Sequence, residues 1–151
     1  MGNYKKRVVI TGIGPVTPVG IGKEAYWESL IHGKSSFRRI EFPGRDMSQY
    51  RCRIAAPIEG FDLGRYVERS KHSKYFGKTS QYAVAATRIA LEDAGIQFER
   101  NEAGTKNPHE QKSEYRLRGI DPFHIGVILG VSVECMEILE HYHERFLSRG
   151  T

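Results

Sequence analysis

Two glycines separated by one residue follow a short apolar run near the N-terminus, and this spacing is the first that could carry chemistry. Gly12 and Gly14 come directly after Arg7–Thr11, as glycines do in dinucleotide-binding loops, where the backbone approaches a pyrophosphate at a helix N-terminus. Thr17 replaces the third glycine of that pattern, and two prolines in the loop would disrupt the first turn of the required helix. We therefore predict no bound cofactor.

A second group of reactive side chains lies near the C-terminus, on a segment with helical spacing. Glu137 and His141, or Glu140 and Glu144, would lie one turn apart and could form a pair of metal ligands. The spacing matches no known zinc-binding helix, and such side chains on an outer helix face are usually solvated. We predict no metal site. The full group is Cys135, Glu137, Glu140, His141, His143 and Glu144.

The two cysteines are candidates for nucleophilic catalysis, which requires a serine or cysteine on a sharp strand-to-helix turn with a base beside it. Cys52 lies between Arg51 and Arg53, whose charges would favour a thiolate only if they approached the sulfur, and no base motif accompanies it. Cys135 lies near an expected helix start, where a small buried thiol is the simpler interpretation. We interpret both as thiols and assign no catalytic residue.

A basic segment precedes the longest expected helix, with Glu68 as its one acidic residue. Such a segment favours binding of phosphate or of an acidic protein surface. A plain solvated face is an equal alternative, because Lys and Arg side chains are mostly exposed in any protein. The basic residues are Arg65, Arg69, Lys71, Lys74 and Lys78.

Five segments are expected to form the regular elements that position these residues. Apolar, β-branched runs predict buried strands at Arg7–Thr11 and His124–Gly130. Apolar residues at helical spacing predict helices at Lys23–His32, from about Ser73 or Thr79 to Ala94, and at Glu134–Leu147.

Two further segments are expected to be irregular. Lys34–Gly64 is aperiodic, with one strand expected at Arg51–Ala56, and 99–118 is a polar insertion expected to be disordered. The order of elements predicts an α/β fold with parallel strand-helix units. Two strands are too few for a stable sheet, since ordering one residue costs about 1–2 kcal/mol while burial returns about 25 cal/mol per Å². We therefore expect further chain to complete the domain.

Length and composition are those of an ordinary globular chain. The sequence has 151 residues, 39% of them hydrophobic, and a net charge of +5, which is neither disordered nor fibrous in character. The basic excess is too small for a dedicated nucleic-acid binder. The sequence has no apolar run of about 18 residues and no signal-like leader, so we expect a cytoplasmic protein without a membrane span.

Taken in order, the landmarks resemble the N-terminal part of β-ketoacyl-acyl-carrier-protein synthases of types I and II and of polyketide ketosynthases. No single motif is decisive, but the ordered series covers nearly the whole chain apart from the polar insertion. The matching residues are Arg7–Gly14, Thr17–Gly20, Trp27, Leu30, Gly33, Ser35, Phe61–Asp62, Gln81–Ala83, Ala86, Ala90, Asp93–Gly95, Ile125–Val127 and Gly130.

The resemblance implies a partial thiolase-like fold, with residues 1–151 forming the opening third of a β-ketoacyl synthase domain. Members of the family condense acyl and malonyl thioesters by a decarboxylative Claisen reaction in fatty-acid or polyketide biosynthesis. Their catalytic cysteine and two histidines stand later in the fold, beyond Thr151, so the chain alone is expected to be inactive. The implied partners are acyl carrier protein and either a second copy of the same chain, in a homodimer, or the remainder of a synthase.

Lys71 and Lys74 resemble basic positions that face the acidic carrier protein in the family, and opposite charge raises encounter rates. The chain departs from the family after Gly130, where Ser132, Glu134 and Cys135 stand at glycine positions. Two smaller departures are Ser36 and the stretch Phe76–Lys78. These changes keep a second hypothesis open, a non-catalytic ketosynthase-like partner that binds a carrier protein or a full-length synthase.

Overall fold

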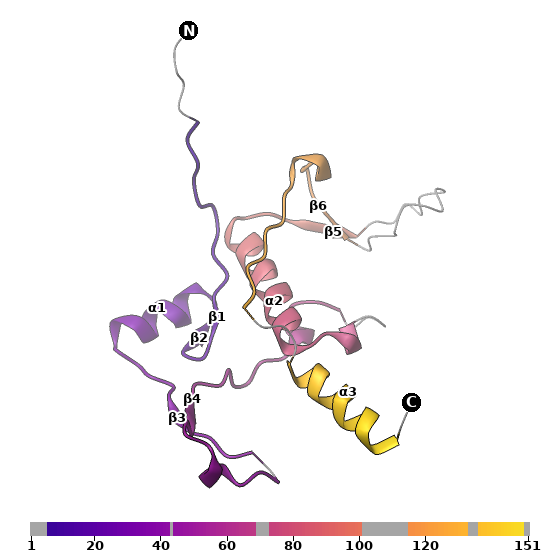
Figure 1. Cartoon of the computed structure of the whole chain (residues 1–151). Coiled ribbons are helices and arrows are strands. Elements are labelled where there is room, and N and C mark those ends of the chain that lie inside the picture. Colours follow the sequence, from indigo (N-terminus) through magenta and orange to yellow (C-terminus); the bar gives the residue numbers. More distant parts are fainter. Residues whose placement is uncertain (1–5, 43, 69–72, 101–114, 133–135, 150–151) are drawn as a thin grey trace.

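The computed structural model describes residues 6–42, 44–68, 73–100, 115–132 and 136–149 (Figure 1). It contains the three helices that the sequence predicts, α1 (Lys23–Ile31), α2 (Lys78–Asp93) and α3 (Met136–Arg149). The first two end at glycines with left-handed backbone, Gly33 at φ 61° and Gly95 at φ 71°. A residue with a Cβ atom adopts this conformation at a cost, which explains why glycine follows each helix.

The strands of the described ranges form three separate two-stranded antiparallel sheets. β1 (Val16–Thr17) pairs with β2 (Gly20–Ile21), β3 (Arg38–Arg39) with β4 (Ile54–Ala55), and β5 (Phe98–Arg100) with β6 (Tyr115–Leu117). The strand expected at 51–56 is thus reduced to two residues, whose partner lies in the same irregular excursion.

The two expected parallel strands are not formed, and this corrects the sequence prediction. Residues 7–11 are extended but unpaired, and residues 125–130 follow a short 3-10 turn at Pro122–His124 without joining a sheet. Their apolar side chains are exposed, Ile10 to 86% and Ile128 to 98%. The described residues provide no strand beside either segment, and a strand pairs only where a neighbour presents its backbone groups.

The polar insertion 99–118 was expected to be disordered, but its two ends belong to paired strands. Residues 98–100 and 115–117 pair as β5 and β6, with Glu99 opposite Arg116, and the two side chains form an ion pair at 2.6 Å. The intervening residues 101–114, on which most of the prediction falls, lie outside the described residues.

Phe61 and Asp62 connect the irregular excursion to α2. The Phe61 ring packs edge-on against Tyr82, with ring centroids 4.9 Å apart. Asp62 accepts a hydrogen bond from the backbone N–H of Gly64 at 2.9 Å and caps the short 3-10 turn Leu63–Arg65. This pair therefore has a structural role that places the turn against the helix.

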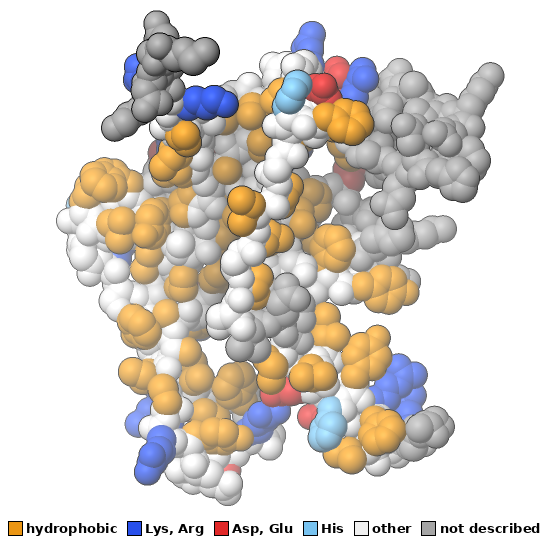
Figure 2. Space-filling view, turned by 45° about the horizontal axis from the view of Figure 1, so that its top comes forward, with side chains coloured by type: hydrophobic (Ala, Val, Ile, Leu, Met, Phe, Trp, Pro, Cys, Tyr) orange, Lys and Arg blue, Asp and Glu red, His pale blue; other side chains and the backbone are white. Residues whose placement is uncertain are grey.

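The chain buries little of its apolar surface. Ala85 is the one hydrophobic side chain that is buried among the described residues, and hydrophobic side chains are spread over the face in Figure 2. The accessible surface is 13569 Å², whereas a compact protein of 17.2 kDa is expected to expose about 7,800 Å². The described elements therefore do not enclose an apolar core of their own.

Candidate functional site

The segment Gly12–Gly22, which we call the glycine loop, lies against α2 (Figure 1). A Cβ atom on Gly12 would stand 2.1 Å from the carbonyl oxygen of Ala90, and one on Gly14 would stand 2.0 Å from that of Ala86. Ala86, Ala90 and Ala94 follow one another at four-residue spacing and form the helix stripe that the loop crosses. The two glycines thus allow the loop backbone to approach the helix backbone, which gives them a packing role.

Asp93 fixes the same loop to both neighbouring helices. Its Oδ2 accepts a hydrogen bond from the backbone N–H of Ile13 at 3.0 Å, and its Oδ1 forms an ion pair with Lys23 at the start of α1. The hydrogen bond from Lys23 is the main cause that lowers the pKa of Asp93 below its usual value, and the Ile13 bond adds to it. Asp93 therefore joins loop, α1 and α2.

Hydroxyl groups hold the remainder of the loop. Ser29, which is 5% exposed, donates to the carbonyl oxygen of Val19 at 2.6 Å, and Ser36 donates to that of Pro18 at 2.7 Å. Ser36 is one of the departures from the family pattern, and here it supplies a bond that glycine lacks. The loop is thus a structural junction.

The acidic residues of α3 hold this helix to the rest of the chain. Glu137 accepts a hydrogen bond from the backbone N–H of Lys78 at 2.7 Å, at the N-terminus of α2, where Gly77 provides no side-chain cap. Glu140 forms an ion pair with Arg45 at 3.3 Å. Cys135 lies outside the described residues, within which no group of three or more ligating side chains could hold a metal ion.

Acidification is expected to release α3 from α2. The Lys78 N–H is the main cause that holds the pKa of Glu137 below 4.5, so this contact stabilises the docked helix above pH 4.5 and is lost as the pH falls through the lowered value. Glu137→Gln keeps an acceptor but removes the charge, and we expect it to abolish this pH dependence. The amide shift of Lys78, followed by NMR, is the measurement. The same titration in the matched variant Glu144→Gln, on an exposed position of α3, should remain that of the parent chain.

The thiol of Cys52 is exposed. Among the described residues, no basic side chain forms a hydrogen bond with it. Its Sγ lies 3.4 Å from the carbonyl oxygen of Ile54. The guanidinium of Arg53 donates to the carbonyl oxygens of Tyr50 at 3.1 Å and Ser48 at 2.8 Å. Arg53 is thus engaged with the backbone, and the structure supports no nucleophilic role for this cysteine.

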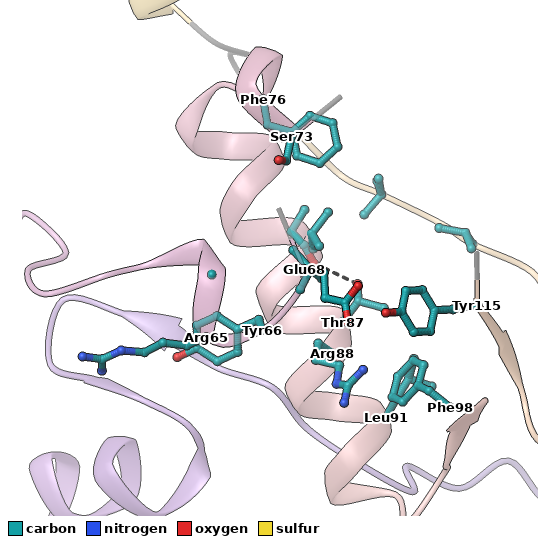
Figure 3. Close-up of a pocket in the computed structure, with 16 residues that line it drawn as sticks. Arg65, Tyr66, Glu68, Ser73, Phe76, Thr87, Arg88, Leu91, Phe98 and Tyr115 are labelled. Atoms are coloured by element: carbon teal, nitrogen blue, oxygen red, sulfur yellow. Dashed lines mark hydrogen bonds between the residues drawn. The ribbon is translucent and has the colours of Figure 1, made fainter. Parts of the chain in front are cut away.

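The basic segment is described only in part. Arg65 ends the turn Leu63–Arg65 and borders the pocket drawn in Figure 3, from which its side chain extends away. Arg69 and Lys71 lie outside the described residues, and Lys74 lies in the turn Ser73–Tyr75 with its side chain outside the description. The binding role of Lys71 and Lys74 therefore stays a prediction.

An apolar groove runs along α2, and sequence reasoning did not find it (Figure 3). Its volume is about 860 Å³. We call it the α2 groove; its lining includes Phe76, Val84, Leu91, Phe98, Val127 and Leu129. The guanidinium of Arg88 lies 3.9 Å above the Phe98 ring and pairs with Glu92 at 2.5 Å, so its charge is satisfied at the rim.

A signal for this groove is present in the sequence. Val84, Thr87 and Leu91 lie at helical spacing beside the alanine stripe, so α2 has an apolar face wider than the glycine loop covers. The periodicity indicates this second apolar stripe of α2, but it does not indicate which segment of the chain packs against the stripe.

Known proteins of one family match nearly the whole of this chain. Residues 5–148 match the family model "Beta-ketoacyl synthase, N-terminal domain". A solved structure, "The ishigamide ketosynthase/chain length factor", is 34% identical and superposes with a TM-score of 0.51 over 59% of this chain and 21% of its own. The chain belongs to the β-ketoacyl synthase family, as a segment that matches the N-terminal domain, and its fold is part of a thiolase-like fold.

Two curated relatives specify the resemblance further. The "3-oxoacyl-[acyl-carrier-protein] synthase 2" of Vibrio cholerae is 30% identical over 97% of this chain and 30% of its own length. The "Tetracenomycin polyketide synthase ketoacyl synthase alpha subunit" of Streptomyces glaucescens is 32% identical over 97% of this chain and 29% of its own. The chain thus spans about 30% of the length of these relatives. No helix in the described ranges is long and apolar enough to cross a membrane.

Proposed function

We propose that this chain is the N-terminal segment of a 3-oxoacyl-[acyl-carrier-protein] synthase II-like condensing enzyme in fatty-acid or polyketide biosynthesis. The observation that carries the proposal is the family match over residues 5–148, together with relatives from both pathways. The reaction is a decarboxylative Claisen condensation. The acyl group passes to an enzyme cysteine, and the carbanion formed by loss of carbon dioxide from a malonyl thioester attacks the acyl carbonyl and expels the cysteine thiolate.

None of the described residues is assigned a catalytic role. The residues that could attract chemistry are engaged in packing: Gly12 and Gly14 on α2, Asp93 between α1 and α2, and Glu137 at the α2 N-terminus. This segment would serve as a scaffold. It holds two extended apolar segments, Arg7–Thr11 and residues 125–130, for the part of the enzyme that carries the catalytic side chains.

The proposed partner is an acyl carrier protein, bound through Lys71 and Lys74. Carrier proteins are acidic, so positive charges at these positions would raise the encounter rate and the affinity at low salt. The double variant Lys71→Glu/Lys74→Glu is expected to weaken carrier binding by about tenfold or more at low salt. The loss should shrink as salt is added, because screening removes the contribution of exposed charges. Titration calorimetry against acyl carrier protein measures both effects.

A matched control separates this site from net charge. Lys34→Glu/Arg149→Glu makes the same charge change at two exposed positions on other elements, and carrier affinity is expected to stay within about twofold of the parent. Equal affinity for the parent and the Lys71/Lys74 variant at low salt would contradict the assignment of this site.

A further inference from the structure

Helix α3 carries its acidic side chains on one stripe. Glu137, Glu140 and Glu144 are spaced by three and four residues, and residues at these spacings are neighbours on a helix surface. Large apolar side chains lie on the other side of the helix and remain exposed, Leu139 to 62% and Phe146 to 58%. The acidic stripe is therefore the side of α3 whose contacts need an explanation.

This stripe meets positive charge at two places. Glu137 accepts the hydrogen bond from the backbone N–H of Lys78, the first residue of α2, and Glu140 pairs with Arg45 of the irregular excursion. The N-terminus of a helix carries partial positive charge, and α2 has no side-chain cap of its own. Both contacts thus join a carboxylate of α3 to a positive group of another element.

The two contacts hold α3 only weakly. The Arg45 and Glu140 side chains are 47% and 53% exposed, and exposed ion pairs contribute little to stability and weaken with salt. Among the described residues, no other hydrogen bond or ion pair connects α3 to another element. An acidic competitor can therefore displace the helix from its docked position.

The docked helix lies at the end of α2 from which the proposed carrier site extends. α3 adjoins the end of α2 that begins with Lys78 (Figure 1), and the turn Ser73–Tyr75, which contains Lys74, comes just before it. An acidic partner that approaches this turn is attracted to the same positive helix end as the carboxylate of Glu137. The partner and α3 cannot hold that helix end at the same time.

We propose that α3 is an autoinhibitory acidic strap, which covers the start of α2 and Arg45 and competes for them with an acidic protein partner. The inference rests on the proposed function, because the partner that it names is the acyl carrier protein. It goes further in giving Glu137 and Glu140 a regulatory role. The partner binds only those chains in which the strap is released, so its apparent affinity falls in proportion to that fraction.

Removal of the two strap contacts tests the competition. The variant Glu137→Gln/Glu140→Gln takes both charges from the stripe. At low salt we expect it to bind acyl carrier protein about threefold to tenfold more tightly than the parent chain, as measured by titration calorimetry. The matched control Glu24→Gln/Glu28→Gln makes the same change in net charge at two exposed positions of α1. Its affinity for the carrier should stay within about twofold of the parent.

The strap itself is followed by NMR relaxation of the Tyr142 amide, in the middle of α3. This amide reports docking, because a released helix moves independently on the nanosecond timescale. In the parent chain we expect it to gain motion when carrier protein is added, and also when salt screens the two contacts. In the variant Glu137→Gln/Glu140→Gln it should be mobile from the outset.

A poly-glutamate peptide serves as a second acidic probe, which does not depend on recognition of the carrier fold. The proposal is overturned by equal affinities of parent and strap variant for both probes, or by an α3 that stays ordered while a probe binds. An equal gain in the α1 control would attribute the effect to net charge and would also overturn it. If the variant binds poly-glutamate more tightly but neither chain binds carrier protein, the proposed carrier site is contradicted and the strap stands.

Discussion

Gly14→Val is expected to detach the glycine loop from α2 and to lower the free energy of unfolding by about 1–3 kcal/mol or more. The added Cβ would stand 2.0 Å from the carbonyl oxygen of Ala86 and 2.7 Å from the backbone nitrogen of Ala90. Both atoms belong to the helix backbone, which has no rotamer to change, so the loop itself must move. Urea unfolding followed by circular dichroism measures the loss.

Two further variants make this prediction specific. Ala86→Gly should not rescue Gly14→Val, because the clash is with a backbone oxygen and not with the alanine side chain. Gly126→Ala should change the stability of the chain by less than about 0.5 kcal/mol, since its Cβ meets open space. A stable Gly14→Val chain would show that the loop does not pack closely on α2.

Ser29→Ala is expected to cost about 1–3 kcal/mol, the second-largest effect. The Ser29 side chain lies in α1, is 5% exposed and donates to the carbonyl oxygen of Val19 at 2.6 Å. Removal of the hydroxyl leaves that carbonyl without its donor in a partly buried place, where water replaces the bond poorly. Thermal unfolding of the variant against the parent chain gives the difference.

Ser36→Ala is the matched control for Ser29→Ala. Ser36 makes a similar bond to the carbonyl oxygen of Pro18, but in an exposed position. Water can take over the freed carbonyl there, so we expect a cost below about 0.5 kcal/mol. Equal losses in the two variants would mean that burial does not distinguish the two bonds.

The helices of this fold could be predicted because their signals are local. Apolar spacing and the glycine that follows predict both ends of α1 to within one residue. The same signals predict that α2 ends at Ala94, and the helix ends at Asp93. Helix hydrogen bonds join residues four apart, so the sequence of a helix contains its own partners. The family followed from the same local landmarks, and the match over 5–148 confirms it.

The strands could not be predicted in the same way. Arg7–Thr11 and His124–Gly130 have the composition of buried parallel strands, but they stay unpaired in the described chain. A strand requires a neighbouring strand from elsewhere in the sequence. The composition of a segment indicates its propensity to form a strand, but it does not identify the strand with which it pairs.

The candidate site shows the same division. The sequence by itself determined the family, the positions of the helices and the departure from a dinucleotide-binding loop at Thr17. Only the tertiary structure decided that Gly12 and Gly14 lie on α2, that Glu137 caps that helix, and that Val127 and Leu129 line an open groove. These are contacts between residues that are distant in sequence, and their formation depends on the packing of whole elements, which no local pattern encodes.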